Sequence, residues 1–328
     1  MPLIEREGNE KRKLSHDNDL CVGCGICSDT CPTDALRLGA IVPIARGILN
    51  MDYVSVNNDK CVLCGLCASS CPFGALDLEI DGESIKDLGN YPVWTHSSEI
   101  DEEECIYCGK CSDVCPQDAV FFTRELPDIN DLLVGTVEVL EDDCIYCSVC
   151  AELCPVSAIT IGTDPVSGVP NSIEVDESKC VYCGVCKRVC PESAIRAVCT
   201  TCMHAEEIEK PTIEGTAFIE SKCVNCGWCK SICPTGAASV TKPFDGEIAR
   251  DPELVCKGDT CHACKDVCPC NAIEIIDGAS VINPEFCTLC GACTKACPQH
   301  LLSAVRKEMK LENINSASWK EILGNLTQ

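Results

Sequence analysis

The sequence predicts an α+β protein assembled from several small, similar domains, and three observations support this fold class. One cysteine pattern recurs eight times along the 328 residues. Short apolar segments that alternate with a period of two flank most of the copies, as expected for short strands. The aliphatic content is also low, because the 46% of hydrophobic residues includes 35 cysteines. Something other than apolar packing must therefore stabilise these domains.

The recurring pattern is C-x2-C-x2-C-x3-C-P, and its copies are numbered one to eight along the chain. Seven copies keep this spacing, whereas copy seven has two additional residues between its first and second cysteines. In order, the copies contain Cys21, Cys24, Cys27 and Cys31; Cys61, Cys64, Cys67 and Cys71; Cys105, Cys108, Cys111 and Cys115; Cys144, Cys147, Cys150 and Cys154; Cys180, Cys183, Cys186 and Cys190; Cys223, Cys226, Cys229 and Cys233; Cys256, Cys261, Cys264 and Cys268; and Cys287, Cys290, Cys293 and Cys297.

The flanking segments predict the secondary structure of each copy. The residues between the third and fourth cysteines suit one short helix, and the proline that follows ends the cysteine loop and fixes φ. Strands are expected after the loops at residues 35–38, 75–78, 158–161 and 272–275, and before them at residues 53–56 and 172–175.

This cysteine spacing is typical of bacterial ferredoxins that hold two iron–sulfur clusters. Three cysteines at i, i+3 and i+6 wrap a loop around one corner of a cubane, and the fourth ligates the other cluster of the pair. In copies one and two, Cys71 is thus expected to complete the site of copy one, and Cys31 that of copy two. Applied to all copies, the pattern predicts eight [4Fe-4S] clusters with all 32 of these cysteines as ligands.

Zinc, disulfide bonds and a simple metal store each account for the cysteines less well. Zinc sites explain neither the third cysteine nor the Cys-Pro step. Disulfides cannot pair all of an odd number of cysteines, and we find neither a secretory signal nor a membrane-length apolar run, so a cytoplasmic location with reduced thiols is expected. A thiol-rich metal store needs no frame of strands and helices between its cysteine groups.

Pairing consecutive copies predicts four tandem bacterial-type 2[4Fe-4S] ferredoxin-like domains, over residues 1–85, 86–166, 167–247 and 248–305. The remaining residues, 306–328, are expected to form a helical tail. A nested arrangement, with copies four and five inserted between copies three and six, is an alternative. It exchanges only the assignments of the fourth cysteines.

Three cysteines lie outside this scheme. Cys199 and Cys202 form a CxxC in a connector, which could be half a zinc site or a redox pair but is more simply two sheltered thiols. Cys270 could replace Cys268 as a ligand, but Cys268 has the standard spacing and the following proline. His262 lies inside copy seven, and its ligation of iron is not expected because Cys256 is available.

Two positions within the repeat have further expected roles. The residue after the second cysteine is glycine in six copies, which fits a close approach of backbone to a cluster. Ser148 and His262 stand there in copies four and seven. Tyr107, Tyr146 and Tyr182 precede the second cysteine of their copies and are expected to shield the clusters from water.

Charge and missing motifs exclude several classes of function. The chain has 51 acidic and 26 basic residues, a net charge of −25, and no basic face for nucleic acid. It has no phosphate-binding loop, zinc-protease motif or nucleophile elbow, so no catalytic residue is expected. Each oxidised cluster with four thiolates would add two negative charges, which favours low reduction potentials. The sequence thus predicts a conductor or reservoir of low-potential electrons.

The whole repeat resembles the archaeal polyferredoxins. Residues 5–13 leading into CVGCGIC, the segment CVLCGLCASSCPFGAL, and residues 84–91 ahead of CIYCGKC look like the polyferredoxin subunits of tungsten- or molybdenum-dependent formylmethanofuran dehydrogenases. The resemblance spans about residues 5–300. It implies a non-catalytic subunit that relays electrons to and from the catalytic and other subunits that reduce CO2 in methanogenesis.

The resemblance also suggests partners and leaves alternatives. Heterodisulfide reductase, hydrogenase or a ferredoxin would be the electron donor. One alternative is a polyferredoxin that connects to a hydrogenase or heterodisulfide reductase instead. Another, of a different class, is a stand-alone store of electrons or iron–sulfur clusters. Neither nucleic acid nor a membrane span is expected.

Overall fold

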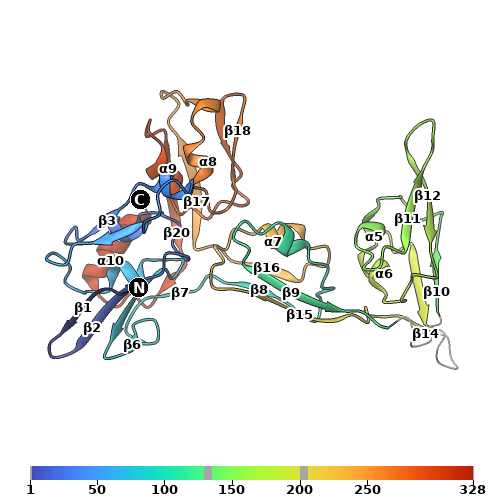
Figure 1. Ribbon diagram of the computed structural model, residues 1–328, viewed down its shortest axis with the longest axis horizontal. Helices are drawn as coiled ribbons and strands as arrows, with labels where there is room; N and C mark the ends of the chain where they lie inside the picture. The colour runs from blue at the N-terminus through green and yellow to red at the C-terminus, as the bar shows by residue number, and fades with distance from the viewer. Residues whose placement is uncertain (1, 129–134, 200–205, 328) are drawn as a thin grey trace.

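The computed structural model describes residues 2–128, 135–199 and 206–327, which fold into four small units of one elongated molecule (Figure 1). Copies one and two form the N-terminal unit, copies three and six the middle unit, copies four and five the distal unit, and copies seven and eight the C-terminal unit. The chain runs from the N-terminal unit through the middle unit to the distal unit, and then returns (Figure 1). Both termini therefore lie at the same end of the molecule.

All four units share one architecture. The strand before the first copy of a unit pairs with the strand after its second copy, and the two intervening strands also pair, both antiparallel. The short helices that carry the third cysteines pack against each other. In the N-terminal unit the pairs are β2 (Lys11–His16) with β5 (Leu76–Ile80), β3 (Leu36–Leu38) with β4 (Val54–Val56), and α1 (Ile26–Asp29) with α3 (Leu66–Ser69).

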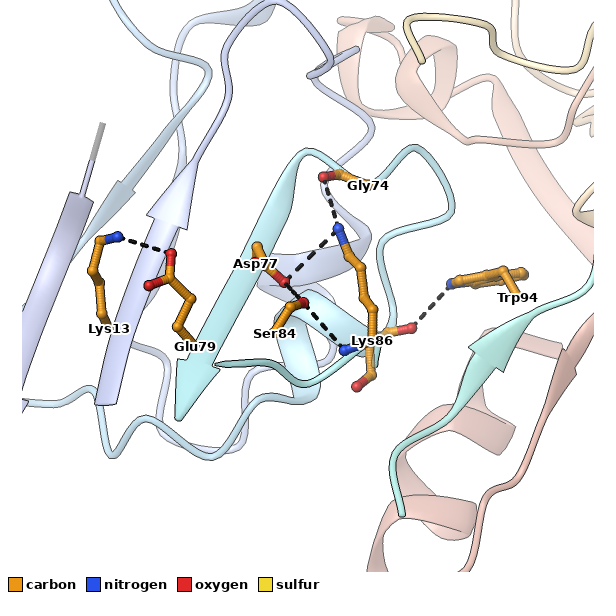
Figure 2. A network of polar contacts seen from close by, with 8 residues as sticks. Lys13, Gly74, Asp77, Glu79, Ser84, Lys86 and Trp94 are labelled. Carbon is orange, nitrogen blue, oxygen red and sulfur yellow. Dashed lines mark hydrogen bonds and ion pairs between the residues drawn. The ribbon is translucent and has the colours of Figure 1, made fainter. Parts of the chain in front are cut away.

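The N-terminal unit has additional elements. Strands β1 (Pro2–Glu7) and β6 (Glu83–Ser84) extend its sheet to the order β1-β2-β5-β6, and helix α2 (Ile41–Ala45) follows β3. Polar contacts tie the strands together (Figure 2): Lys13 pairs with Glu79 at 2.8 Å, and Ser84 donates to Asp77 at 2.7 Å. The first contact joins β2 to β5, and the second joins β6 to β5.

The middle and distal units are nested, one inside the other along the chain. In the middle unit, β8 (Ser98–Ile100) pairs with β16 (Ala238–Val240), β9 (Val120–Glu125) with β15 (Glu214–Ile219), and α4 (Lys110–Asp113) packs on α7 (Trp228–Ile232). In the distal unit, β10 (Gly135–Val139) pairs with β13 (Ile195–Cys199), which also pairs with β14 (Glu206–Glu207). Strand β11 (Ile159–Thr163) pairs with β12 (Pro170–Val175). Helix α5 (Val149–Glu152) packs on α6 (Val185–Val189).

The tandem boundaries 86–166 and 167–247 are therefore wrong, and the nested alternative describes the strand pairing. Strand β9 continues past copy three to pair with β15 along six residues, from Val120 opposite Ile219 to Glu125 opposite Glu214. The spacings between copies three, four, five and six are similar, so the sequence offers no signal for this long-range pairing. Strand register, fixed by contacts far apart in the chain, decides which copies share a unit.

The C-terminal unit repeats the architecture and corrects the expected tail. Strand β17 (Phe244–Arg250) pairs with β20 (Leu302–Met309), so residues 306–309 of the expected helical tail belong to a strand. The tail helix is confined to α10 (Ala317–Gly324) and is followed by the 3-10 turn η2 (Asn325–Thr327). The remaining elements are η1 (Gly258–Thr260), α8 (Ala263–Asp266), β18 (Ile273–Ile276) paired with β19 (Ala279–Ile282), and α9 (Ala292–Ala296).

The two terminal units pack against each other. Strand β21 (Leu311–Glu312) pairs with β7 (Val93–Trp94). Trp94, labelled in Figure 2, donates its indole N–H to the carbonyl of Ser69 at 3.0 Å. Two ion pairs cross the same interface, Lys295 with Asp29 at 2.8 Å and Arg46 with Asp266 at 2.6 Å. The two units also share an apolar cluster of Ile26, Leu66, Phe244, Leu289, Leu311, Leu323 and Leu326.

The expected strands at residues 35–38, 53–56, 75–78, 158–161, 172–175 and 272–275 are confirmed to within one or two residues at their starts. The third cysteine of every copy lies in a short helix, as expected. Among the described residues, the helices are all too short and too polar to cross a membrane.

Candidate metal centres

A repeated backbone conformation shapes every cysteine loop. The second residue after the first cysteine and the residue after the second cysteine have positive φ in all eight copies. Such turns point successive backbone N–H groups toward the inside of the loop, as in anion-binding nests. The residues are Gly23, Leu63, Tyr107, Tyr146, Tyr182, Asn225, Gly258 and Leu289 at the first position, and Gly25, Gly65, Gly109, Ser148, Gly184, Gly227, His262 and Gly291 at the second.

The same conformation locates the insertion in copy seven. Gly258 has φ 52° and donates its N–H to Cys256 Sγ at 3.4 Å, as Tyr107 and Leu289 do to Cys105 and Cys287. The two additional residues follow Gly258 and lie in the turn η1. Cys256 therefore keeps the place of a first cysteine. His262 instead lies 3.0 Å from the carbonyl oxygen of Asp259.

The fourth cysteine of most copies accepts a hydrogen bond from the backbone four residues later. The donor is an alanine N–H in each case: Ala35 to Cys31, Ala119 to Cys115, Ala158 to Cys154, Ala194 to Cys190 and Ala272 to Cys268, at 3.2–3.4 Å. Cys268 thus has the environment of a fourth cysteine, which supports choosing it over Cys270.

Cys270 is a buried neighbour of Cys268. Its thiol lies 3.4 Å from Thr288 Oγ1, and its hydrogen bond to Cys268 lowers the pKa of Cys268. The pKa of Cys31 is also lowered. Burial alone would raise it, but the backbone N–H groups of Thr33 and Ala35 outweigh burial.

Four cavities are each lined by three cysteines of one copy and the fourth cysteine of its partner copy. Residues of two copies therefore meet in every one of these cavities, which is the crossed arrangement expected of a two-cluster ferredoxin. The four sets are Cys105, Cys108 and Cys111 with Cys233; Cys144, Cys147 and Cys150 with Cys190; Cys180, Cys183 and Cys186 with Cys154; and Cys256, Cys261 and Cys264 with Cys297.

Electrostatic proximity shows the same crossing in the remaining four sets. Burial, with a further contribution from Cys71, raises the pKa of Cys21 to about 12 and the pKa values of Cys24 and Cys27 well above the ordinary value. In the other three sets, burial is the main cause that raises the cysteine pKa values, and the fourth cysteine of the partner copy is a further cause. Cys31 acts in this way on Cys64 and Cys67, Cys115 on Cys226, and Cys268 on Cys287, Cys290 and Cys293.

Nesting changes four assignments of fourth cysteines. Consecutive pairing assigns Cys154 to the site of copy three, whereas Cys233 lines that cavity. Cys154 instead lines the cavity of copy five, and Cys190 that of copy four. Cys115 lies close to Cys226 of copy six. The set of 32 cysteines is unchanged, because only their grouping differs.

The cysteine sets fit a multi-atom cluster that carries positive charge. Burial raises the pKa of Cys186 and Cys290 to about 12, so these thiols need a cationic centre to become thiolates near neutral pH. Four of the cysteine sets also surround cavities, with their thiols spaced around the lining. A cubane, whose four irons sit at separate corners, suits such spaced thiols.

The remaining candidate residues are placed as follows. Tyr107, Tyr146 and Tyr182 each line the cavity of their own copy, which supports the shielding role. Cys147 in copy four is exposed, in contrast to the rest of the cysteines in the eight copies. Cys199 ends strand β13, and Cys202 lies outside the described residues.

Comparisons with protein families match most of the repeat. Residues 20–75, 60–119 and 143–194 match a 4Fe-4S dicluster domain, residues 98–161 match a second family of the same description, and residues 216–239 and 280–303 match a 4Fe-4S binding domain. The chain is a ferredoxin-type protein of repeated 4Fe-4S dicluster domains, which confirms the predicted fold class. Domains of this class transfer electrons.

Individual relatives show which ferredoxin-type proteins this chain is similar to. The chain is 50% identical over 135 residues to the polyferredoxin protein FwdF of Methanocaldococcus jannaschii, a match over 41% of this chain and 38% of the relative, less than two thirds of its length. A chain of the formate dehydrogenase–heterodisulfide reductase–formylmethanofuran dehydrogenase complex of Methanospirillum hungatei superposes with a TM-score of 0.60 and 29% identity, over 98% of this chain and 87% of that one. One subunit of the Na⁺-translocating ferredoxin:NAD⁺ oxidoreductase complex of Acetobacterium woodii is 49% identical over 43 residues, 13% of each protein.

Proposed function

We propose that this chain carries eight [4Fe-4S] clusters, two in each unit, and passes low-potential electrons along its length. The observation that carries the proposal is the contact between cysteine loops at every junction of neighbouring units. Electrons tunnel between clusters only when the clusters are close, so a conductor must bring loops of different units together. A store of independent clusters has no such requirement.

At the junction of the distal and middle units, the loops share an apolar cluster. Ile106, Leu153 and Val185 are buried in it, together with Cys183 of copy five, and Cys108 of copy three packs against it. Arg188 pairs with Glu104 across the same junction. Second cysteines of two different units therefore face one apolar layer.

The middle and C-terminal units meet through Trp228 of copy six. Its ring stacks on Phe286 with centroids 3.5 Å apart, and its indole N–H donates to the carbonyl of Cys270 at 2.8 Å. Gln117 donates to the carbonyl of Pro269 at 2.8 Å nearby. The loop of copy six is thus held against the loops of the C-terminal unit.

The C-terminal and N-terminal units bring Cys290 and Cys24 within electrostatic range of each other. The apolar cluster of Ile26, Leu66 and Leu289 seals this contact from water. The three junctions together connect the distal tip to the paired terminal units without a break. We infer that electrons follow this series of contacts.

The chain acts, on this proposal, as the non-catalytic polyferredoxin of a formylmethanofuran dehydrogenase in the cytoplasm of a methanogenic archaeon. The similarity to FwdF and to a chain of the Methanospirillum hungatei complex supports this assignment. That complex also contains a heterodisulfide reductase and a formate dehydrogenase, which supports heterodisulfide reductase as an electron donor. Catalysis would then occur on partner chains.

Native purification tests the proposal. The chain is expected to contain about 32 iron atoms, from eight clusters of four, and to elute with a metal–pterin subunit in a fixed ratio. An iron content near 16 would contradict the eight-cluster assignment. Fully loaded protein that elutes alone, or with a hydrogenase, would contradict the assigned partner while leaving electron transfer intact.

A further inference from the structure

The guanidinium of Arg306 is a buried cation at the junction of the two terminal units. It lies on strand β20 and is only 9% exposed. Within the described residues, no carboxylate forms an ion pair with it, although twelve such pairs are found elsewhere. Burying a cation without a counter-charge is costly. The groups packed around Arg306 must therefore offset this cost.

The contacts of Arg306 fix its position on the loop of copy eight. Nε donates to the carbonyl of Leu289 and Nη2 to the carbonyl of Cys290, both at 2.8 Å. A Cβ added to Gly291 would lie 3.0 Å from Nη2, so the guanidinium packs directly on the loop. The guanidinium also lies over the ring of Phe244, at 4.6 Å from the centroid.

The ionisable groups that face Arg306 are mainly cysteines of two different units, which would be thiolates with clusters bound. Burial lowers the pKa of Arg306, while Cys24 of copy one, Cys290 of copy eight, Asp29 and Cys287 raise it. Phe244 contacts Trp94 edge-on, and Trp94 is anchored to Ser69 of copy two. The guanidinium thus lies at the junction of the two units, hydrogen-bonded to Cys290 of copy eight and within electrostatic range of Cys24 of copy one.

We propose that Arg306 is a positioning residue for electron transfer between the N-terminal and C-terminal units, whose fixed positive charge stabilises the reduced clusters of copies one and eight. The proposal rests on the proposed function. Each cluster gains one negative charge on reduction, so a nearby cation in a site of low dielectric favours the reduced state. Water does not screen a charge this deeply buried, in contrast to surface lysines.

Redox titration of the loaded full chain, followed by visible absorption, tests this role. In Arg306→Gln, two of the eight clusters are expected to be reduced at lower potential. About a quarter of the absorbance lost on reduction should therefore shift to lower potential. The expected decrease in the reduction equilibrium constant is at least tenfold, about 59 mV for one electron. The shift should persist at high salt, because the charge is buried.

Two further variants keep the test decisive. Lys307→Gln removes the same charge from the exposed neighbour on β20 and should leave the titration unchanged. Arg306→Lys keeps the charge but loses the two-pronged contact with the loop, and its potentials should stay close to those of the parent. If Arg306→Gln binds full iron with unchanged potentials, or if Arg306→Lys shifts as far as Arg306→Gln, the proposal is overturned. A parent chain without eight clusters would instead overturn the proposed function.

Discussion

The fourth cysteine of each copy lies next to a site built by another copy. Cys71 is the clearest example, because it lies near Cys21, Cys24 and Cys27 although it follows Cys67 by only four residues. The short helix and the Cys-Pro step turn the fourth thiol away from its own loop. The crossed placement of the fourth cysteines therefore follows from the local geometry of the copies.

Double replacement tests the crossing in the N-terminal unit. Cys71→Ala should remove the cluster of copy one, about four iron atoms. Adding Cys24→Ala should remove no more iron, because both residues serve the same cluster, whereas adding Cys64→Ala should remove about four more. Iron analysis of the purified chains measures the difference. The reverse pattern would mean that each copy binds its own cluster.

Cysteine spacing alone predicts the 32 candidate ligands, whereas their grouping depends on the fold. The Cys-Pro step distinguished Cys268 from Cys270, and the N–H of Ala272 on Cys268 supports that choice. No local signal distinguishes Cys154 from Cys233 as the partner of copy three. Arg306 was also missed, because its role depends on a strand pairing and a unit interface that the sequence does not reveal.

At the scale of the element, the cysteine loop depends on two residues of positive φ. Sequence reasoning assigned the glycines after the second cysteine to close backbone approach. The structure adds a conformational reason, since φ is 80° at Gly109 and 67° at Ser148. An L-residue in this region costs roughly 1–2 kcal/mol. Copies four and seven bear this cost at Ser148 and His262.

Replacement of these residues should therefore have opposite effects. Ser148→Gly is expected to stabilise the distal unit by about 0.5–1 kcal/mol, because relief of backbone strain exceeds the added entropy of the unfolded chain. Gly109→Ala should destabilise the middle unit by at least about 1–2 kcal/mol, since its Cβ would also lie 2.4 Å from the ring of Phe122. Thermal unfolding of the loaded proteins gives both signs. A lower midpoint for Ser148→Gly would contradict this account.

The tail shows why element prediction failed at one place. Residues 306–328 were expected to form a helical tail, and a helix forms at Ala317–Gly324. Residues 302–309 instead supply the strand that β17 requires, with Leu302 and Arg306 buried and Ser303 and Lys307 exposed. Pairing with β17, which lies more than fifty residues earlier in the chain, therefore decides the conformation of residues 302–309.

For the whole molecule, the order of units follows from nesting. A chain that runs out and back places the distal unit at the tip and brings the two terminal units together (Figure 1). Copy eight then faces two neighbours: Cys24 lies near Cys290, and Lys242 lies near both Cys226 of copy six and Cys287. Copy eight thus lies where three units meet.

Nesting predicts that the distal unit can be excised cleanly. Glu125 and Glu214 lie opposite each other at the end of the β9–β15 pair. Replacing residues 126–213 by Asn-Gly, which favours a tight hairpin turn, should leave six clusters and about 24 iron atoms. Tandem pairing would instead leave copies three and six without partners, with about 16 iron atoms.

As the matched control, removal of residues 86–166 splits both nested units and should cost more than the two clusters that it deletes. Iron analysis and circular dichroism of the two shortened chains therefore distinguish the arrangements: about 16 iron atoms in the first chain would refute nesting, and about 24 in the second would support tandem domains.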